Sequence, residues 1–294
     1  MNNIKKTYEK NLTGLLGHPV AHSKSPLMHN TAFELLGLDY TYELFDVKED
    51  EMDEAFAQLK EVGIKGFNCT MPDKIKAYEL ADELSPAAKL IGACNTVVND
   101  NGKFVGHNTD GIGFVSALSN KGFDIKNKKM TILGCGGAAL AIIVQCALDQ
   151  AKAIDVLCIK DKFFDNAKEF TNKVATQTGC DIKLIEMTDE SIKQSINTSD
   201  LLANATPVGM APNVDGCLVP DPSYIKPDMY VMDIIYNPLE TKLYKMAEQR
   251  GATVLNGIDM LYYQADAAFK LWTGHSFPES VHDVLYNSIQ NTNK

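Results

Sequence analysis

The stretch Met130-Thr131-Ile132-Leu133-Gly134-Cys135-Gly136-Gly137-Ala138-Ala139 decides the fold of the second half of the chain. An apolar run leads directly into a glycine-rich turn, and a second apolar segment follows. A G-x-G-x-x-A pattern between a strand and a helix is typical of a Rossmann unit, whose backbone N–H groups bind a pyrophosphate. The turn therefore predicts four cofactor-binding residues, Gly134, Gly136, Gly137 and Ala138.

Apolar and amphipathic segments alternate on both sides of this turn. Such alternation is typical of βαβ units and of a largely parallel sheet. Before the turn, the expected strands cover residues 12–16, 40–47 and 64–68, and the expected helices cover residues 49–62, 74–84 and 110–121. After it, the expected strands cover residues 153–159, 201–205 and 230–235. The Asn101-Gly102 pair predicts a hairpin over residues 97–106.

The pattern predicts an α/β protein with two domains. With 294 residues and 45% hydrophobic content, the chain can bury a sizeable core. We expect an N-terminal α/β substrate domain over residues 1–121 and a doubly wound Rossmann cofactor domain over residues 122–256. Residues 257–294 are expected to form helices that return to the substrate domain. The active site is expected in the cleft between the two domains.

Charge and hydropathy exclude several classes of protein. The net charge is −10, and the sequence has no basic stripe of the kind that nucleic-acid-binding proteins carry. A small anionic substrate remains compatible, because an acidic protein can hold a locally positive site. The most apolar stretch, residues 138–148, contains Gln145 and is shorter than the roughly 18 residues of a membrane span. We therefore expect no nucleic-acid partner and no membrane insertion.

The seven cysteines are scattered, odd in number and never in C-x-x-C spacing. This pattern argues against a disulfide framework and against a zinc site, so we expect no metal. Buried thiols in a reducing compartment are the better interpretation. Residues 1–10 are polar and lack the apolar core of a secretory signal. The sequence therefore predicts a cytoplasmic protein.

Two polar segments in the first half contain a candidate pair for proton transfer. They read Asn68-Cys69-Thr70-Met71-Pro72-Asp73-Lys74 and Gly106-His107-Asn108-Thr109-Asp110-Gly111. An ammonium group near a developing alkoxide can supply both charge stabilisation and a proton, and a carboxylate can hold that ammonium in place. Taken alone, a lysine at a helix start and an aspartate at a helix N-cap are also common for structural reasons. Lys74 and Asp110 therefore need support from other motifs.

A third segment, Gly17-His18-Pro19-Val20-Ala21-His22-Ser23-Lys24-Ser25-Pro26, provides that support. Together the segments resemble the shikimate dehydrogenase family, with the blocks H-S-x-S-P, N-x-T-x-P-x-K, G-A-x-N-T and N-T-D in order. The resemblance continues at residues 233–238 and 257–264 and covers roughly residues 12–274. The segments at residues 123–126 and 160–164 are more similar to the quinate/shikimate dehydrogenase branch.

The resemblance implies a function and a site. The implied reaction is reversible hydride transfer between NAD or NADP and a ring alcohol of shikimate, which gives 3-dehydroshikimate, with quinate and 3-dehydroquinate as a second candidate pair. Lys74 and Asp110 match the family's catalytic dyad. The positions that match its contacts to the polyhydroxy carboxylate substrate are Ser23, Ser25, Tyr42, Thr70, Asn95, Thr109, Tyr236 and Gln264. Further matched cofactor positions are Thr206, Met210 and Gly257.

Several of these residues also have structural explanations. Ser23 and Ser25 could cap a helix, Tyr42 could be a half-buried strand tyrosine, and Met210 could lie in the core. As isolated residues, the short polar ones would be turn formers, namely Thr70, Asn95, Thr109 and Gln264. The histidines are interpreted as loop or capping residues, namely His22, His29 and His107.

The chain departs from the family at the cofactor site. Where many members carry Asn-Arg at the end of the second Rossmann strand, it has Cys158-Ile159, and Leu140 replaces a further arginine. Lys160 could restore part of the positive charge, whereas Asp161 could accept a hydrogen bond from a free ribose 2′-hydroxyl. We therefore expect NAD to be preferred over NADP.

Alternative functions remain open at this point. A quinate-preferring catabolic dehydrogenase would use the same scaffold, and NAD is the usual acceptor in catabolic oxidation. A ligand-binding regulator without turnover is a hypothesis of another class, which the intact Lys74 and Asp110 disfavour. For the oligomeric state we expect a monomer or a homodimer.

Overall fold

Strand β7 (Lys129–Leu133) and helix α6 (Gly137–Leu148) flank the glycine-rich turn, as the sequence predicts. Four of the five residues of β7 and seven of the twelve residues of α6 are buried, which fits their largely apolar sequences. The computed structural model describes residues 4, 7–70 and 73–292.

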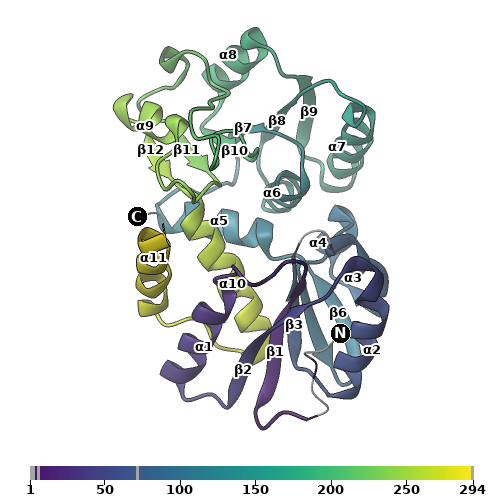
Figure 1. Cartoon of the computed structure of the whole chain (residues 1–294). Coiled ribbons are helices and arrows are strands. Elements are labelled where there is room, and N and C mark those ends of the chain that lie inside the picture. The colour runs from purple at the N-terminus through teal and green to yellow at the C-terminus, as the bar shows by residue number, and fades with distance from the viewer. Residues whose placement is uncertain (1–3, 5–6, 71–72, 293–294) are drawn as a thin grey trace. The chain divides into compact units, whose positions relative to one another are not determined.

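The chain divides into two units, whose elements Figure 1 labels. Unit 1 consists of residues 1–110 and 264–288, and unit 2 consists of residues 111–263 and 289–294. The division therefore falls at the first residue of helix α5 (Asp110–Asn120), which the sequence analysis places at the end of the first domain.

The sheet of unit 2 is entirely parallel, with the strand order β12-β11-β10-β7-β8-β9. Counted from β7, this is the doubly wound order of a dinucleotide-binding Rossmann fold. The other strands are β8 (Ala153–Cys158), β9 (Asp181–Glu186), β10 (Leu201–Asn204), β11 (Tyr230–Asp233) and β12 (Thr253–Leu255). The predicted Rossmann fold is confirmed.

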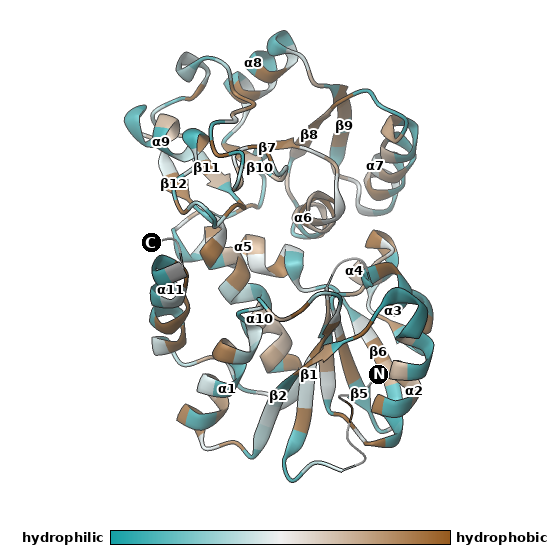
Figure 2. Cartoon of the chain, in the orientation of Figure 1, coloured by the Kyte–Doolittle hydropathy of each residue, from teal (hydrophilic) through white to brown (hydrophobic). Residues whose placement is uncertain are grey.

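Helices connect these strands and carry the polar surface of unit 2. They are α7 (Phe164–Thr178), α8 (Asp189–Thr198), α9 (Lys242–Gln249) and the short 3-10 helix η2 (Pro222–Tyr224). In Figure 2 strand β8 is coloured mainly hydrophobic, whereas α7 carries hydrophilic residues along its length. Edge strand β9 was not predicted, because only Ile182 of its six residues is fully buried and its apolar signal is weak.

The sheet of unit 1 is mixed, with the order β2-β1-β3-β5-β6-β4. Its strands are β1 (Asn11–Gly17), β2 (Tyr40–Asp46), β3 (Gly66–Cys69), β4 (Glu83–Leu84), β5 (Thr96–Asp100) and β6 (Lys103–His107). The predicted hairpin around Asn101-Gly102 joins β5 and β6, and β5 also runs antiparallel to β3. The expectation of a largely parallel sheet therefore holds only for the first three strands and for β4 with β6.

Helices cover this sheet and present several of the motif residues. They are α1 (Ser25–Leu36), the 3-10 helix η1 (Glu49–Glu51), α2 (Met52–Glu61), α3 (Lys74–Leu80) and α4 (Pro86–Ile91). Helix α3 is shorter than predicted, because Ala81 adopts an extended conformation and the chain continues into β4.

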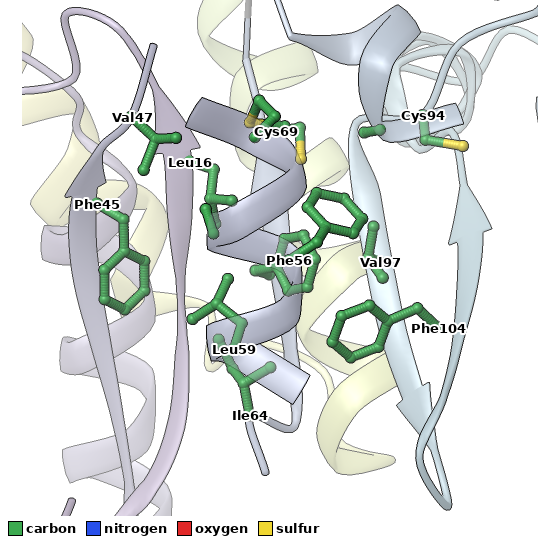
Figure 3. Packing of buried hydrophobic residues seen from close by; sticks show 14 of the residues in the cluster. Leu16, Phe45, Val47, Phe56, Leu59, Ile64, Cys69, Cys94, Val97 and Phe104 are labelled. Atoms are coloured by element: carbon green, nitrogen blue, oxygen red, sulfur yellow. The ribbon is translucent and has the colours of Figure 1, made fainter. Parts of the chain in front are cut away.

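An apolar cluster holds α2 against the sheet of unit 1. Figure 3 shows Phe56 of α2 between Leu59 of the same helix and Phe104 of β6. The rings of Phe56, Phe67 and Phe104 meet edge to face, with centroids 5.0 to 5.8 Å apart. Such aromatic pairs contribute roughly 0.5–1.5 kcal/mol beyond the area that they bury. The cluster therefore anchors strands β3 and β6, whose ends lead to the two polar motif segments.

Two C-terminal helices follow strand β12. They are α10 (Gly257–Thr273) and α11 (Ser280–Thr292). In unit 1, Trp272 of α10 donates a hydrogen bond from Nε1 to the carbonyl oxygen of Val97, at 3.0 Å. A Cβ at Gly66 would collide with the Trp272 ring, so glycine is required for this contact. In the part of the chain that the structure describes, no helix is long and apolar enough to span a membrane.

Candidate active site

Lys74 and Asp110 form an ion pair in unit 1, with 2.5 Å between Lys74 Nζ and Asp110 Oδ2. Lys74 is the first residue of α3, and Asp110 is the first residue of α5. An aspartate in the first turn is favourable, because the helix dipole is positive there. The side chains are 26% and 13% exposed, so the pair is shielded but can still be reached from solvent. The structure thus brings together the two residues that the sequence analysis paired.

Asn95 holds the other oxygen of this carboxylate. Its Nδ2 donates to Asp110 Oδ1 at 2.8 Å and to Thr109 Oγ1 at 2.9 Å, and it lies 3.5 Å from Gln264 Oε1. In return, Asn95 Oδ1 accepts a hydrogen bond from the backbone N–H of Thr109, at 2.8 Å. Asp110 is therefore fixed between an ammonium and an amide, each bonded to a different oxygen.

Two residues beneath the pair were missed by the sequence analysis. Asn68 Nδ2 donates to Thr96 Oγ1 at 3.0 Å and to the carbonyl oxygen of Asn95 at 3.1 Å. Thr96 Oγ1 in turn donates to Asn95 Oδ1, at 2.9 Å. Both residues stand inside blocks that the sequence analysis quoted, so membership of a block was the signal that could have found them.

Tyr42 and Thr109 are more deeply buried than residues in direct contact with a ligand usually are. Tyr42 is 2% exposed, and its hydroxyl donates to Asn68 Oδ1 at 2.7 Å. Burial raises the pKa of the Tyr42 phenol, and a hydrogen bond with the Ser25 side chain acts in the opposite direction. Thr109 is fully buried. We therefore expect Tyr42 to act through Ser25 and Asn68, and Thr109 to act through Asn95.

Ser23 and Ser25 lie at the start of α1 but do not cap it with their side chains. The N-cap residue is Lys24, and the helix start has no side-chain cap hydrogen bond. The Ser23 hydroxyl instead accepts a hydrogen bond from the backbone N–H of Ser25, at 3.2 Å. Both serines are half-buried. The helix-capping explanation of these residues is therefore wrong.

Thr70 follows β3 and packs closely against the end of β1. A Cβ placed on Gly17 would lie only 2.4 Å from Thr70 Cγ2, so a larger residue at position 17 would displace this threonine. Thr70 is half-buried, and its backbone N–H donates to the carbonyl oxygen of Leu16 at 3.1 Å. Met71 and Pro72, which belong to the same quoted block, lie outside the described residues.

A buried carboxylate directly precedes Lys74. Asp73 is 0% exposed, and neither of its oxygens has a hydrogen-bond partner among the residues that the structure describes. Burial, together with the negative charge of Glu49, raises the pKa of Asp73 to about 6. The negative charge at Asp73 is therefore reduced in mildly acidic solution, only one residue from the ion pair.

The interpretation of the histidines as loop or capping residues is wrong for two of the three. His29 lies inside α1, is fully buried and stacks on the Tyr42 ring with centroids 4.3 Å apart. Burial lowers its pKa to about 3, so the ring is neutral. His107 is the last residue of strand β6, and burial also lowers its pKa. His22 lies in the turn before α1.

The glycine-rich turn of unit 2 has the shape that a pyrophosphate requires. Gly134 has a φ of +99°, and a Cβ there would lie 2.6 Å from Thr206 Cγ2. Gly136 is the N-cap residue of α6, and added Cβ atoms at Gly136 and Gly137 would meet nothing within 4 Å. Ala139 is fully buried against the sheet. The turn thus combines tight backbone, open space and close helix packing, which fits a dinucleotide.

Beyond the end of strand β8, the charged side chains already have partners. Lys160 Nζ lies 3.6 Å from Glu186 Oε2, and Asp161 Oδ1 accepts a hydrogen bond from the backbone N–H of Phe163 at 2.9 Å. Ile159 is 64% exposed. The exposed apolar side chain of Ile159 therefore occupies the position where the resemblance places an arginine.

Buried hydrogen bonds hold the loop that follows strand β10. Thr206 Oγ1 donates to Asn204 Oδ1 at 2.7 Å, and Asn204 Nδ2 donates to Asp233 Oδ1 at 3.0 Å. Thr241 donates to the other oxygen of Asp233, at 2.6 Å. Met210, at the end of this loop, is 45% exposed, so the alternative explanation that it lies in the core is wrong.

Two other matched positions of unit 2 lie close to strand β11. Tyr236 is 42% exposed and follows this strand. Gly257 begins α10, and a Cβ there would lie 1.9 Å from the carbonyl oxygen of Ile234. Glycine is therefore required at position 257, because any side chain would collide with the backbone.

Comparison with known proteins gives consistent matches. Residues 15–97 match the model of the shikimate dehydrogenase substrate binding domain. The shikimate dehydrogenase (NADP(+)) of Listeria innocua is 42% identical over 277 residues, which cover 94% of this chain and 95% of that protein. The quinate/shikimate dehydrogenase of Escherichia coli is 42% identical over 285 residues, which cover 96% of this chain and 98% of that protein.

A solved structure agrees with these matches over nearly the whole chain. The shikimate 5-dehydrogenase of Listeria monocytogenes, in complex with shikimate and NAD, has a TM-score of 0.91 and 40% sequence identity. The similarity covers 97% of this chain and 98% of that one. Both the substrate-domain blocks and the dinucleotide turn lie within the matched length. The chain therefore belongs to the shikimate dehydrogenase family.

Proposed function

We propose that this protein is a dehydrogenase that interconverts shikimate and 3-dehydroshikimate with NAD or NADP. The observation that carries the proposal is the Lys74–Asp110 ion pair, with Asn95 bonded to the same carboxylate. The open glycine-rich turn of unit 2 supports the dinucleotide. Relatives with the two names, shikimate dehydrogenase and quinate/shikimate dehydrogenase, are both 42% identical, so we propose quinate as a second substrate to test.

In this mechanism Lys74 moves the proton of the reacting hydroxyl. During reduction the Lys74 ammonium gives a proton to the developing alkoxide and becomes a neutral amine, and during oxidation that neutral amine takes the hydroxyl proton back. A dinucleotide held at the turn of Gly134, Gly136 and Gly137 would accept or supply the hydride. Asp110 remains a carboxylate, so it stabilises the ammonium and keeps Nζ in one position. Asn95 limits the rotation of that carboxylate, because its amide is bonded to Oδ1.

We further propose that Ser23 and Ser25 bind the carboxylate of the substrate. Neither hydroxyl is used as a helix cap, and both side chains are partly accessible. Hydroxyl donors suit this task, since a carboxylate remote from the reacting carbon needs hydrogen bonds and not acid–base chemistry. The burial of Tyr42 behind Ser25 restricts the orientation of that serine.

Replacing both Ser23 and Ser25 with alanine should raise KM for shikimate more than it lowers kcat. Contacts to a remote carboxylate act alike on the ground state and the transition state, so their loss appears mainly in KM. The measurement is steady-state kinetics of the double variant. Ser85→Ala is the matched control, because Ser85 does cap α4 by accepting from the Ala88 N–H. The control should lower Tm without changing KM; a double variant that behaves like it would contradict the assignment.

We propose that NAD is preferred over NADP, because Cys158-Ile159 at the end of strand β8 provides no arginine for a 2′-phosphate. Lys160 is paired with Glu186, and Ile159 stands where an arginine would bind. A 2′-phosphate without such a partner loses charge-assisted hydrogen bonds worth roughly 1.5–3 kcal/mol each. Asp161 adds repulsion. The structure of the Listeria monocytogenes relative contains NAD, whereas the Listeria innocua relative is named for NADP(+).

A turnover assay with two substrates and two cofactors tests the function and the preference together. We expect kcat/KM for NAD to exceed that for NADP by at least about tenfold, since each 1.4 kcal/mol is a factor of ten. Asp161→Ala should improve the use of NADP by removing the repulsion, and Glu186→Gln should do so by releasing Lys160. A tenfold preference for NADP that is indifferent to Asp161→Ala would contradict the preference, and no turnover of either substrate would contradict the function.

A further inference from the structure

We propose that Thr96 is a positioning residue that locks the amide of Asn95 so that its nitrogen faces Asp110. The inference rests on the proposed function, because Asp110 matters through its pairing with Lys74. Thr96 is the first residue of strand β5 and is 0% exposed. Its Oγ1 lies 3.0 Å from Asn68 Nδ2, 2.9 Å from Asn95 Oδ1 and 3.3 Å from Thr109 Oγ1.

The single proton of the Thr96 hydroxyl decides the direction of these bonds. Asn68 Nδ2 also donates to the backbone carbonyl of Asn95, which can only accept, so the orientation of the Asn68 amide is fixed. Because an amide nitrogen is only a donor, Thr96 Oγ1 must accept from Asn68. Its own proton is then free to go to Asn95 Oδ1.

A second donor confirms which end of the Asn95 amide is the oxygen. The backbone N–H of Thr109 also points to Asn95 Oδ1, at 2.8 Å, and a backbone N–H cannot accept. The Thr109 hydroxyl is a third donor to this oxygen, at 3.2 Å, so the Asn95 amide must direct Nδ2 toward Asp110 Oδ1, at 2.8 Å. A flipped amide would place its oxygen against the carboxylate and its nitrogen against the Thr109 N–H.

The bonds form one chain in which every member donates toward the catalytic carboxylate. The Tyr42 hydroxyl donates to Asn68 Oδ1, Asn68 donates to Thr96, and Thr96 donates to Asn95. Asn95 then donates to Asp110, whose other oxygen accepts from Lys74. Hydrogen bonds in series polarise one another, so the donation to Asp110 is strengthened by the bonds behind it. Thr96 connects the two halves of this hydrogen-bond series, because its hydroxyl accepts from Asn68 and donates to Asn95.

This series of hydrogen bonds also connects the two ends of the proposed substrate site. The Tyr42 phenol, at its beginning, is hydrogen-bonded with the Ser25 side chain, and Asp110 stands at its end. Every interior bond is between buried groups, which makes an unpaired member costly. Removal of the Thr96 hydroxyl would leave Asn68 Nδ2 with one acceptor and Asn95 Oδ1 with one donor fewer.

The test replaces Thr96 with valine, which keeps the shape and removes the hydroxyl, and with serine, which keeps the hydroxyl. We expect Thr96→Val to lower kcat about tenfold, with KM for shikimate and for the dinucleotide within about twofold of the wild type. Thr96→Ser should restore most of kcat. Thr131→Val is the matched control, because Thr131 is an equally buried strand threonine whose hydroxyl pairs with Ser199 at 2.8 Å. It should lower Tm and leave kcat unchanged.

A second measurement separates this inference from the proposed function. Hydrogen exchange of the Asn95 side-chain amide, followed by NMR on the wild-type protein, should be slow and should accelerate at least about tenfold in Thr96→Val. If that variant does not fold, Thr96→Ala provides a second variant without the hydroxyl for the same comparison. Absence of turnover in the wild type would contradict the proposed function but not the role of Thr96 in orienting the Asn95 amide. A kcat within twofold of the wild type, together with unchanged exchange, would overturn the role of Thr96.

Discussion

Replacing Lys74 with alanine should lower kcat for shikimate oxidation by on the order of 10² or more, since general acid–base groups typically contribute 10²–10⁴. Lys74 Nζ is bonded to Asp110 Oδ2 at 2.5 Å, and its side chain remains 26% exposed. An ammonium in this place can reach a reacting hydroxyl while the carboxylate holds its position. Without it, the alkoxide that develops during the reaction loses both its proton source and its charge partner.

The Lys74 experiment has a control on the same helix. Lys76 of α3 is paired with Asp53 at 2.8 Å, two residues from Lys74, so Lys76→Ala removes a lysine without touching the catalytic pair. We expect the control to keep kcat within about twofold and Lys74→Ala to keep its affinity for the dinucleotide. A small amine added to Lys74→Ala should restore part of the rate. Near wild-type turnover of Lys74→Ala would remove this lysine from the mechanism.

Replacing Asp110 with asparagine should be comparably slow, with a loss in kcat on the order of 10². The carboxylate accepts from Lys74 through one oxygen and from Asn95 through the other. An asparagine of the same size has no negative charge, and its NH2 group must face one of these two donors. The lysine therefore loses its charge partner, and the side chain loses one of its two hydrogen bonds.

A double-variant cycle tests whether the two residues act as a unit. The loss in Lys74→Ala with Asp110→Asn should be close to the larger of the two single losses, because residues that act together are strongly non-additive. Asp100→Asn is the control, since Asp100 is exposed at the β5–β6 hairpin and bonds only to its neighbour Asn101 among the contacts described. Losses that simply multiply would show that Lys74 and Asp110 contribute independently.

The Rossmann half of the fold was predictable because its signals are local. The apolar run 129–133, the glycine-rich turn and the apolar helix lie within about twenty consecutive residues, so one window contains strand, turn and helix. Gly134 illustrates why the turn could be predicted from the sequence, since its φ of +99° and the closeness of Thr206 both require glycine at this position. Strand β9 could not be predicted in this way, because an edge strand with little buried surface has a weak hydrophobic pattern.

Part of the candidate site could also be predicted from the order of the motifs. Lys74 and Asp110 stand in two separate blocks, and their pairing rested on matching several blocks at once. Tyr42 and Thr109 were predicted to contact the substrate, but their burial could not be read from the residues. Tyrosine and threonine occur both on surfaces and inside proteins, and only the packing around them decides which.

By itself the sequence determined the fold class and the glycine-rich turn, and it pointed to Lys74 and Asp110 as the proposed catalytic pair, because each depends on short segments or on motifs in a fixed order. Only the tertiary structure decided how Asn68, Thr96 and Asn95 are bonded, since Asn68 reaches Thr96 from another strand and the direction of donation from Thr96 to Asn95 depends on that contact. Likewise, the partner of Lys160 is Glu186, which becomes its neighbour only when β8 and β9 pair. Local propensity acts over a few residues, whereas hydrogen-bond partners across a sheet are chosen by strand order and register.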